Sequence, residues 1–409
     1  MSNDTHLTIV GNPDNRRVAL FTRAAAAAGL PAPEVIAWRG VAAGEAIAFR
    51  PGTLVRIDSP GEDPEVDRLL RHAKDQAEHG EITGTRAWFE GFAQALTRID
   101  KAAADAGAHL LHDPAEILIM FDKSCTHAHL SEAGIPVPPA LPDSPGDWPT
   151  LRARLRDQGW ARVFVKPRHS SSASGVIALQ QASNGRIMAT TSTELADGRV
   201  FNSLRVRTYR DEQTVAAIID RLAPDGLHVE RWFPKADLNG KVVDLRVVVI
   251  GGTPTHAVVR SSHTPITNLH LGNTRGDLQT LKQAAGSAYE KAMETCEKTA
   301  VLFPGSPHVA IDLMFSPTWQ SQAIAEVNAF GDLLPGVTTN GQDTYAAQIA
   351  TILNSPTNHV PPSSSNQPTV DPPPPGPGQV SGRGSTHDGI KPDRPEWVDP
   401  RPETPTATP

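Results

Sequence analysis

The sequence predicts a mixed α/β protein: an open α/β domain comes first, a region of hairpins and helices follows, and a disordered tail comes last. Three observations support this prediction. Short apolar runs alternate with helical segments over residues 1–113, which is typical of an open α/β domain. Residues 114–354 combine β-hairpins with amphipathic helices. From residue 355 onward, 15 of the last 55 residues are proline, and such a segment cannot bury enough apolar surface to offset its ordering entropy.

Composition narrows the classes of function. The 409 residues allow two or three domains with a sizeable core. A net charge of −7 and a pI near 6.1 provide no global basic field for nucleic acid. No stretch approaches the roughly 18 apolar residues of a membrane span. The first residues, MSNDTHLTIVG, lack the pattern of a signal peptide. We therefore expect a soluble, cytoplasmic protein.

Only two cysteines occur, Cys125 and Cys296, which excludes a disulfide scaffold and a cysteine-rich zinc site. We expect both to be inert helix residues.

The first domain begins with a buried strand, LTIV, followed by the Gly11-Asn12-Pro13 turn and an alanine-rich helix that ends at Gly29. The loop after this strand lacks the glycine spacing of a dinucleotide fingerprint, so no nicotinamide site is predicted. The further strands expected are residues 35–38, 53–58 and 109–111, and the further helices are residues 64–79 and 85–106.

A helix over residues 115–133 opens the second region and ends at Gly134 and a proline-rich segment. Lys123 lies in its middle and, taken alone, is expected to be a solvated surface lysine. An amphipathic helix over residues 147–160 follows.

A strand, a small-residue loop and a second strand come next: RVFVKP, the loop His169–Gly175, and VIAL. Backbone N–H groups and hydroxyls in such a loop can surround phosphate oxygens. Lys166 at its mouth supplies the cationic charge that a phosphate site needs. An ordinary flexible hairpin is the alternative.

Residues 200–222 mix strand and helix signals and receive no assignment. The run LHVERWFP then predicts a strand that ends in a turn at Glu230–Phe233. Free backbone groups at an apolar strand end suit a flat heterocycle, although a Trp-Phe pair is also common in a core.

Residues 242–261 predict a hairpin in which Asp244 and Arg246 share one face. If the turn centres on Thr253, Arg246 lies opposite Arg260. Two opposed arginines repel unless an anion lies between them, and guanidinium groups suit phosphate or carboxylate oxygens. Exposed strand arginines are the alternative. A polar loop over residues 268–273 and a helix over residues 278–299 follow.

The last hairpin is predicted from two apolar runs, VAIDLMF and AIAEVNAF, which a polar connection joins. Glu326 and Asn328 share a face, and Asp312 lies opposite Glu326 if the hairpin is symmetric about Trp319. Facing carboxylates are destabilising unless something neutralises them, and Mg²⁺ prefers such oxygen ligands. The alternative is a surface hairpin with its acids in water. A helix over residues 344–353 ends the folded region.

The order of these motifs resembles the ATP-grasp superfamily, specifically the branch of glutathione synthetase and the ribosomal-protein glutamate ligase. The resemblance covers about residues 114–353. It implies an ATP-grasp domain of class α+β over residues 114–354, with the nucleotide between two subdomains. A pre-ATP-grasp domain over residues 1–113 precedes it, and the disordered tail, residues 355–409, follows.

For the nucleotide, the resemblance implies two lysines at the phosphates, a flexible phosphate loop, a hinge beside the adenine, and an acidic residue near the ribose and phosphates. The residues are Lys123, Lys166, Ser171, Ser172, Ser174, Gly175, Glu230, Arg231, Trp232, Phe233 and Asp244. Relatives usually place more glycine in the phosphate loop.

For the chemistry, the resemblance implies cations facing the transferred phosphoryl group and oxygen ligands for two Mg²⁺ ions, with Mn²⁺ as an alternative metal. Arg246 and Arg260 are the cations. The metal ligands are Asp312, Glu326 and Asn328. Asn268 is a further catalytic candidate, but relatives often carry Arg-x-Asn where this chain has Ile266-Thr267-Asn268.

The resemblance implies an ATP-dependent carboxylate–amine ligase that forms an amide or peptide bond through an acyl phosphate and releases ADP and phosphate. The substrates would be a small-molecule or peptide carboxylate and an amine, with no nucleic acid or membrane partner. A carboxylase of the same superfamily, a nucleotide-binding regulatory or scaffold protein, and a purely structural protein are the alternatives. The tail is either a linker or a ligand for a proline-binding partner.

Overall fold

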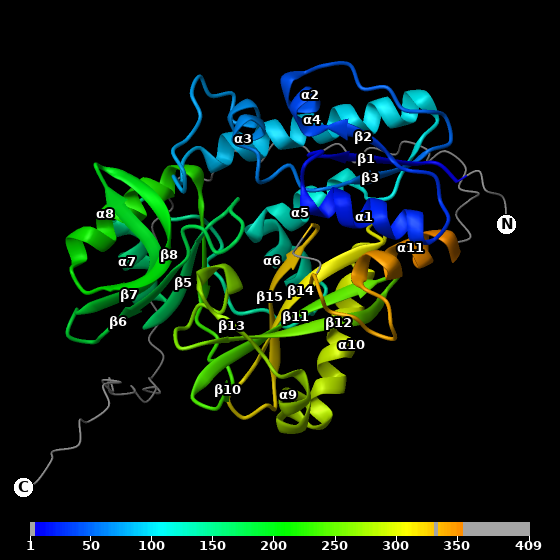
Figure 1. The fold of residues 1–409 in the computed structure, drawn as a ribbon. Helices are drawn as coiled ribbons and strands as arrows, with labels where there is room; N and C mark the ends of the chain where they lie inside the picture. Colours follow the sequence, from blue (N-terminus) through cyan, green and yellow to red (C-terminus); the bar gives the residue numbers. More distant parts are fainter. Residues whose placement is uncertain (1–4, 331–333, 355–409) are drawn as a thin grey trace, which may run out of the picture. The chain divides into compact units, whose positions relative to one another are not determined.

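The computed structural model describes residues 5–330 and 334–354, and these form three β-sheets with helices around them (Figure 1). The predicted tail, residues 355–409, lies outside the described residues. Among the described residues, no helix is long and apolar enough to span a membrane.

The first sheet contains four parallel strands in the order β2-β1-β3-β4. Every residue of β1 is buried, as expected for a strand of a parallel sheet with helices near both faces. The strands are β1 (Leu7–Gly11), β2 (Glu34–Ala37), β3 (Leu54–Ile57) and β4 (His109–Leu110). The helices are α1 (Arg16–Ala27), α2 (Trp38–Ala43), α3 (Pro64–Leu70) and α4 (Thr85–Ala106). The predicted open α/β arrangement of this region is confirmed.

The second sheet is antiparallel, in the order β8-β7-β6-β5-β9. Leucine, isoleucine and valine side chains of α7 and α8 pack against it in one apolar core. The strands are β5 (Arg162–Pro167), β6 (Ile177–Gln181), β7 (Ile187–Ala196), β8 (Arg199–Tyr209) and β9 (Leu227–Arg231). The helices of this part are α5 (Pro114–Phe121), α6 (Lys123–Glu132), α7 (Trp148–Asp157) and α8 (Glu212–Leu222).

The third sheet follows the order β13-β12-β11-β14-β15, and β10 pairs with β11. Its strands are β10 (Asp237–Leu238), β11 (Lys241–Ile250), β12 (Thr253–Ser262), β13 (Thr274–Gly276), β14 (His308–Phe315) and β15 (Gln322–Asn328). The helices that follow β13 are α9 (Leu278–Ala285), α10 (Ser287–Val301) and α11 (Thr344–Asn354).

Alternate residues of β11 and β14 face different surroundings. Val243, Leu245 and Val247 share a core with apolar residues of α9 and α10. Val248 and Ile250 share a different core with residues of α1 and α11, two helices that lie side by side (Figure 1). Because strand side chains alternate, Asp244 and Arg246 lie on the face opposite α9 and α10.

Four predicted elements differ from the structure. The helix expected over residues 64–79 ends at Leu70. Trp38, expected in a strand, begins α2. The helix expected over residues 278–299 divides at Gly286, whose φ of 54° and ψ of −132° are not helical. The helix expected over residues 115–133 divides at Asp122, whose extended backbone (φ −103°, ψ 105°) ends α5 and whose side chain caps α6.

The division at Asp122 changes the position of Lys123. This lysine is the first residue of α6 rather than a mid-helix residue.

The register of the β11–β12 hairpin also differs from the prediction. The turn is Gly251-Gly252, with φ values of 56° and 78°, as a two-residue turn with two left-handed residues requires. A bulge lies between Val248 and Val249. As a result Arg260 lies opposite Asp244, not opposite Arg246.

Candidate functional site

The two predicted carboxylates on β14 and β15 face each other. Asp312 pairs with Glu326, as predicted from symmetry about Trp319, and a bulge follows directly after Asp312. Asn328 pairs with Ala310 two residues farther along, and its Nδ2 donates to the Ala310 carbonyl at 3.4 Å.

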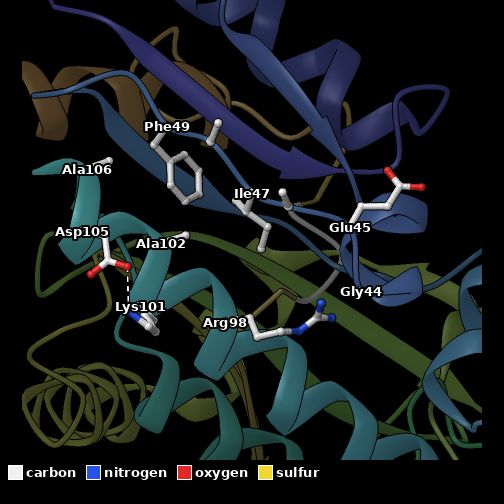
Figure 2. Close-up of a pocket in the computed structure, with 11 residues that line it drawn as sticks. Gly44, Glu45, Ile47, Phe49, Arg98, Lys101, Ala102, Asp105 and Ala106 are labelled. Carbon is white, nitrogen blue, oxygen red and sulfur yellow. Dashed lines mark hydrogen bonds and ion pairs between the residues drawn. The ribbon is translucent and has the colours of Figure 1, made fainter.

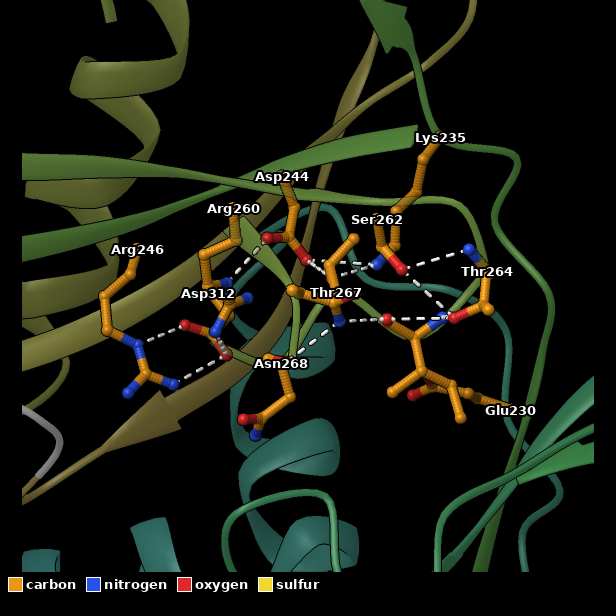
Figure 3. A network of polar contacts seen from close by, with 12 residues as sticks. Glu230, Lys235, Asp244, Arg246, Arg260, Ser262, Thr264, Thr267, Asn268 and Asp312 are labelled. Carbon is orange, nitrogen blue, oxygen red and sulfur yellow. Dashed lines mark hydrogen bonds and ion pairs between the residues drawn. The ribbon is translucent and has the colours of Figure 1, made fainter. Parts of the chain in front are cut away.

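Asp312 accepts hydrogen bonds from both predicted arginines (Figure 3). Arg246 donates through Nε and Nη2 at 2.7 and 2.9 Å, which is the two-pronged geometry typical of strong arginine–carboxylate pairs. Arg260 donates through Nη1 at 3.0 Å. Burial alone would raise the pKa of Asp312, but the two guanidinium groups outweigh it and hold the pKa well below its usual range.

Arg260 also joins Asp312 to a second buried carboxylate. Its Nε donates to Asp244 at 2.7 Å. The predicted opposition of two arginines is therefore wrong: each arginine has a carboxylate opposite it on a neighbouring strand, Asp312 opposite Arg246 and Asp244 opposite Arg260. The shifted turn of the β11–β12 hairpin causes this difference.

Lys235 completes this network, and the sequence analysis did not single it out. Its Nζ donates to Asp244 at 3.0 Å and to the Thr267 hydroxyl at 2.7 Å, and Thr267 itself donates to Asp244. Burial lowers the pKa of Lys235 by more than the nearby Asp244 raises it. A lysine directly after an apolar strand end and a proline is a weak signal, but it was available.

The two predicted nucleotide lysines both lie in this region, on different elements. Lys123 of α6 pairs with Glu326 at 3.1 Å and donates to the Ser170 carbonyl. Lys166 of β5 pairs with Glu230 of β9 at 2.5 Å. The side chain of Lys123 is only 12% exposed, so the alternative of a solvated surface lysine is wrong.

Glu230 receives a second buried partner, His228, at 3.4 Å. Burial would raise the pKa of Glu230, but Lys166 and His228 together lower it to about 2. His228 is a further residue that the sequence analysis missed, because a histidine within an apolar strand is usually part of the core.

A cavity brings these groups together. Eight predicted site residues line it: Lys123, Lys166, Glu230, Asp244, Arg260, Asn268, Asp312 and Glu326. Lys235 and Thr267 line it as well. Arg246 and Asn328 are not among the lining residues, although Arg246 contacts Asp312 directly.

The predicted phosphate loop lies between β5 and β6, and its residues Ser170 and Ala173 reach the cavity. Ser171 and Ser172 are exposed, and Ser174 is partly buried. Gly175 has a φ of 73°, and a Cβ there would come within 2.5 Å of Pro167. A glycine is therefore required where the loop enters β6.

The predicted hinge residues Glu230–Phe233 span the end of β9: Glu230 and Arg231 are its last two residues, and Trp232 and Phe233 follow it. The N–H groups of Arg231 and Trp232 donate to the carbonyls of Pro139 and Arg162, at 2.7 and 3.0 Å. Trp232 packs against Phe164 with their ring centroids 5.1 Å apart. Two of the hinge donors are thus already used, so a heterocycle would depend on other backbone atoms of this segment.

Asn268, the third predicted catalytic residue, holds the loop after β12. Its Oδ1 accepts from the His270 N–H at 2.9 Å, and its carbonyl accepts from Asn273 at 2.9 Å. Its position at the cavity therefore depends on this loop.

Among residues 5–330 and 334–354, no group of three or more histidine, cysteine, aspartate or glutamate side chains is arranged to hold a metal ion. The predicted magnesium ligands, two carboxylates and an amide, remain a prediction.

A second hollow lies on the N-terminal region, between residues 44–49 and the Arg98–Ala106 part of α4 (Figure 2). None of the predicted site residues lines it. Its charged side chains include Glu45 and the Lys101–Asp105 pair, which is 2.7 Å long and exposed. We assign no function to this hollow.

Comparison with known proteins finds solved structures with a similar fold, but no protein family or curated protein with a similar sequence. No protein-family model matches the chain, and a search of curated proteins finds no match. Among solved structures, the chain is similar to D-cycloserine synthetase DcsG, with 16% identity, a TM-score of 0.51, and coverage of 85% of this chain and 99% of that chain.

It is also similar to the macrocyclase MdnC bound with precursor peptide MdnA from Microcystis aeruginosa MRC, with 13% identity and a TM-score of 0.50. That alignment covers 86% of this chain and 100% of MdnC. The described chain therefore has the predicted ATP-grasp fold, and at these identities the similarity shows the fold alone.

Proposed function

From the ATP-grasp fold as premise, we propose that this chain is an ATP-dependent carboxylate–amine ligase that works through an acyl phosphate. One observation carries the proposal: a single cavity gathers buried and partly buried cations and carboxylates from both antiparallel sheets and from α6. Such a set is expensive to bury, so a charged ligand is a better explanation for it than stability.

The charge of the cavity network suits a metal-bound polyphosphate. In this network, as far as the structure describes it, five cations contact four carboxylates. The cations are Lys123, Lys166, Lys235, Arg246 and Arg260, and the carboxylates are Glu230, Asp244, Asp312 and Glu326. One excess positive charge is too little for a triphosphate, so divalent cations are expected to enter with it.

The residues present fit such cations. Asp312 and Glu326 face each other across two strands, and Asn328 keeps its amide oxygen for a cation because Nδ2 faces the Ala310 carbonyl. Asp312 accepts three hydrogen bonds, and a carboxylate has about four acceptor positions. When bound, Mg²⁺ would neutralise charge on the phosphates.

The chemistry that we propose has two steps. First, a carboxylate oxygen of the substrate attacks the γ-phosphorus of ATP and the bond to the β-phosphate oxygen breaks, giving an acyl phosphate and ADP. Second, an amine attacks the acyl carbon, phosphate leaves and the nitrogen loses a proton.

The protein's own groups contribute positioning and charge, which dominate phosphoryl transfer. Arg246 uses two of its five N–H donors on Asp312, and the other three can bind the transferred phosphoryl group or the substrate carboxylate. Lys123 and Lys166 lie beside the phosphate loop and would bind the phosphates of the nucleotide. A phosphate loop that covers the site would also protect the acyl phosphate from water.

The substrates remain open between small molecules and peptides. DcsG is a synthetase, and MdnC is a macrocyclase bound with a precursor peptide. A release assay for ADP, with amino acids and peptides offered in pairs with Mg²⁺ and ATP, tests the proposal. We expect one pair to release ADP, and mass analysis of its product to show a gain of the amine with loss of one water.

Two outcomes would contradict this function. Bicarbonate-dependent ADP release without an amine product would indicate a carboxylase. Tight ATP binding with no ADP release from any pair would indicate a regulatory nucleotide-binding protein.

A further inference from the structure

Asp122 links two parts of the cavity wall that are far apart in sequence. It lies between α5 and α6, and its Oδ1 accepts from the N–H groups of Ser124 and Cys125 at 3.0 and 3.1 Å. This is an ordinary helix N-cap. The side chain is only 5% exposed, although a cap needs no such burial.

Since β5 ends at Pro167, the phosphate loop in the structure comprises residues 168–175, and the same carboxylate binds its first residues. Arg168 donates from Nε to both carboxylate oxygens, at 2.7 and 2.8 Å, and its Nη2 lies 2.7 Å from Oδ2. His169 contacts Oδ2 through Nε2 at 3.2 Å. Asp122 therefore joins one helix start to two successive loop residues.

Backbone contacts and a ring stack tighten this junction. The N–H group of Lys123 donates to the Arg168 carbonyl at 3.1 Å, and the Lys123 ammonium donates to the Ser170 carbonyl. The His169 ring stacks on Phe89 of α4, with centroids 4.2 Å apart and planes 10° apart.

The phosphate loop thus has two parts with different surroundings. Residues 168–170 are held by α6 and by Phe89, whereas Ser171 and Ser172 are exposed. The held part carries the loop to the cavity between Lys123 and Lys166. A buried carboxylate that only capped a helix would not need a guanidinium and an imidazole as additional partners.

We propose that Asp122 is a positioning residue that, through Arg168 and His169, holds the phosphate loop against Lys123 before a nucleotide binds. The ligand class is a nucleoside polyphosphate, so this inference rests on the proposed function. With the loop already held, less ordering entropy opposes binding.

The test separates the cap from the loop contact. Asparagine caps helices about as well as aspartate, but a neutral amide makes weaker bonds to Arg168 than a carboxylate does. Asp122→Asn therefore keeps the cap and weakens the hold on the loop. Asp211→Asn is the matched control, because Asp211 caps α8 in the same way, through Gln213 and Thr214, without contact to the loop.

Limited trypsin digestion measures directly how firmly the start of the loop is held, through the rate of cleavage there. Lys166 precedes Pro167 and resists trypsin, so Arg168 is the cleavable site at the start of the loop. We expect cleavage after Arg168 to be about tenfold faster in Asp122→Asn than in the wild type, given the strength of charged hydrogen bonds. Cleavage in Asp211→Asn should match the wild type, and equal cleavage in all three proteins overturns the inference.

Binding of Mg·ADP, followed by calorimetry, gives the second readout. We expect Asp122→Asn to bind about tenfold more weakly, and Asp211→Asn to bind like the wild type. Faster cleavage with unchanged Mg·ADP affinity overturns the positioning role. If the wild type binds no Mg·ADP, the proposed function fails while the digestion still reports whether Asp122 holds the loop.

Arg168→Lys provides a second variant if Asp122→Asn does not fold. It keeps the positive charge and the trypsin site but loses the forked donor geometry. The same acceleration of cleavage is expected, and its absence counts against the inference.

Discussion

At the scale of single residues, the charged network that reaches the cavity consists of groups that neutralise one another while keeping unused donors. Arg246 is the clearest case, because Asp312 fixes its orientation with two hydrogen bonds. A guanidinium held in this way can meet a developing phosphate charge without reorganising. Such fixed charges are worth more in a buried site than in water.

Replacing Arg246 by alanine tests that role. We expect turnover to fall on the order of a hundredfold, while the dissociation constant for Mg·ATP changes only a few-fold, because Lys123 and Lys166 remain. Steady-state kinetics with calorimetry measures both quantities. Arg207→Ala, which removes an arginine paired with Glu194 on the second sheet, is the control, and equal losses of turnover and affinity in Arg246→Ala would contradict the assigned role.

The lowered pKa of His112 leads to a prediction of how the folding stability depends on pH. Burial, with a further contribution from nearby Arg56, lowers the pKa of His112 to about 3. Below pH 6.5 the unfolded chain binds a proton here that the folded protein does not bind, so folding stability is lost as the pH falls from about 6.5 toward 3. One such group accounts for about 2 kcal/mol at pH 5.

Urea denaturation at pH 7.5 and pH 5 measures this loss. His112→Gln should remove about 2 kcal/mol of the pH-dependent difference, whereas His79→Gln, at an exposed histidine, should remove none of it. A pH dependence that is the same in both variants would exclude His112 as its source.

At the scale of elements, the accuracy of the sequence predictions depended on where the turns are. On β14 and β15 the facing pair Asp312–Glu326 was predicted correctly, although Phe315 pairs with Gln322 and the connection is therefore centred between residues 318 and 319. The bulge between Asp312 and Leu313 shifts the register and brings Asp312 opposite Glu326. The β11–β12 register was wrong because the turn is two residues earlier than the Thr253-Pro254 signal suggested.

Helix divisions and non-local contacts were harder to predict. Asp122 reads equally well as a mid-helix residue and as a cap, and its partners Arg168 and His169 lie 46 and 47 residues away in the sequence. Lys235 likewise joins the charged network through hydrogen bonds to Asp244 and Thr267. Such partners are brought together by folding, and no local pattern contains them.

The turn at Gly251-Gly252 supports an element-scale prediction. Gly252 has a φ of 78° with open space where a Cβ would be, so Gly252→Ala should cost about 1–2 kcal/mol through backbone strain alone. Gly252→Asn should cost less, because asparagine adopts this conformation more readily. Gly146→Ala, at a glycine with open space and no positive φ, is the control, and denaturation midpoints that are alike for Gly252→Ala and Gly146→Ala would contradict the strain argument.

At the scale of the whole molecule, the cavity is lined by both antiparallel sheets. Lys166 and Glu230 come from the second sheet, and Arg260, Asp312 and Glu326 come from the third. A ligand bound there contacts both sheets at once, so binding should stabilise them together.

Thermal denaturation with nucleotide tests this coupling. Mg·ATP at about 100 times its dissociation constant should add about 2.7 kcal/mol of stability, which appears as a single transition shifted upward. Glu326→Gln should lose the part of the shift that depends on Mg²⁺, together with Mg²⁺-dependent ADP formation. A variant with the wild-type Mg²⁺ dependence would remove Glu326 from the metal ligands.

Successive side chains of β11 and β14 alternate between a charged face and an apolar face, and this alternation has an evolutionary consequence. Residues 244, 246 and 312 lie in the charged network, while Val243, Leu245 and Leu313 belong to the core behind it. Mutational scanning of these strands should give a two-residue rhythm: one set of positions abolishes catalysis while the protein remains abundant, and the other depletes the protein. Substitutions on the charged face can therefore change the reaction during evolution while the apolar face, and with it the fold, stays the same.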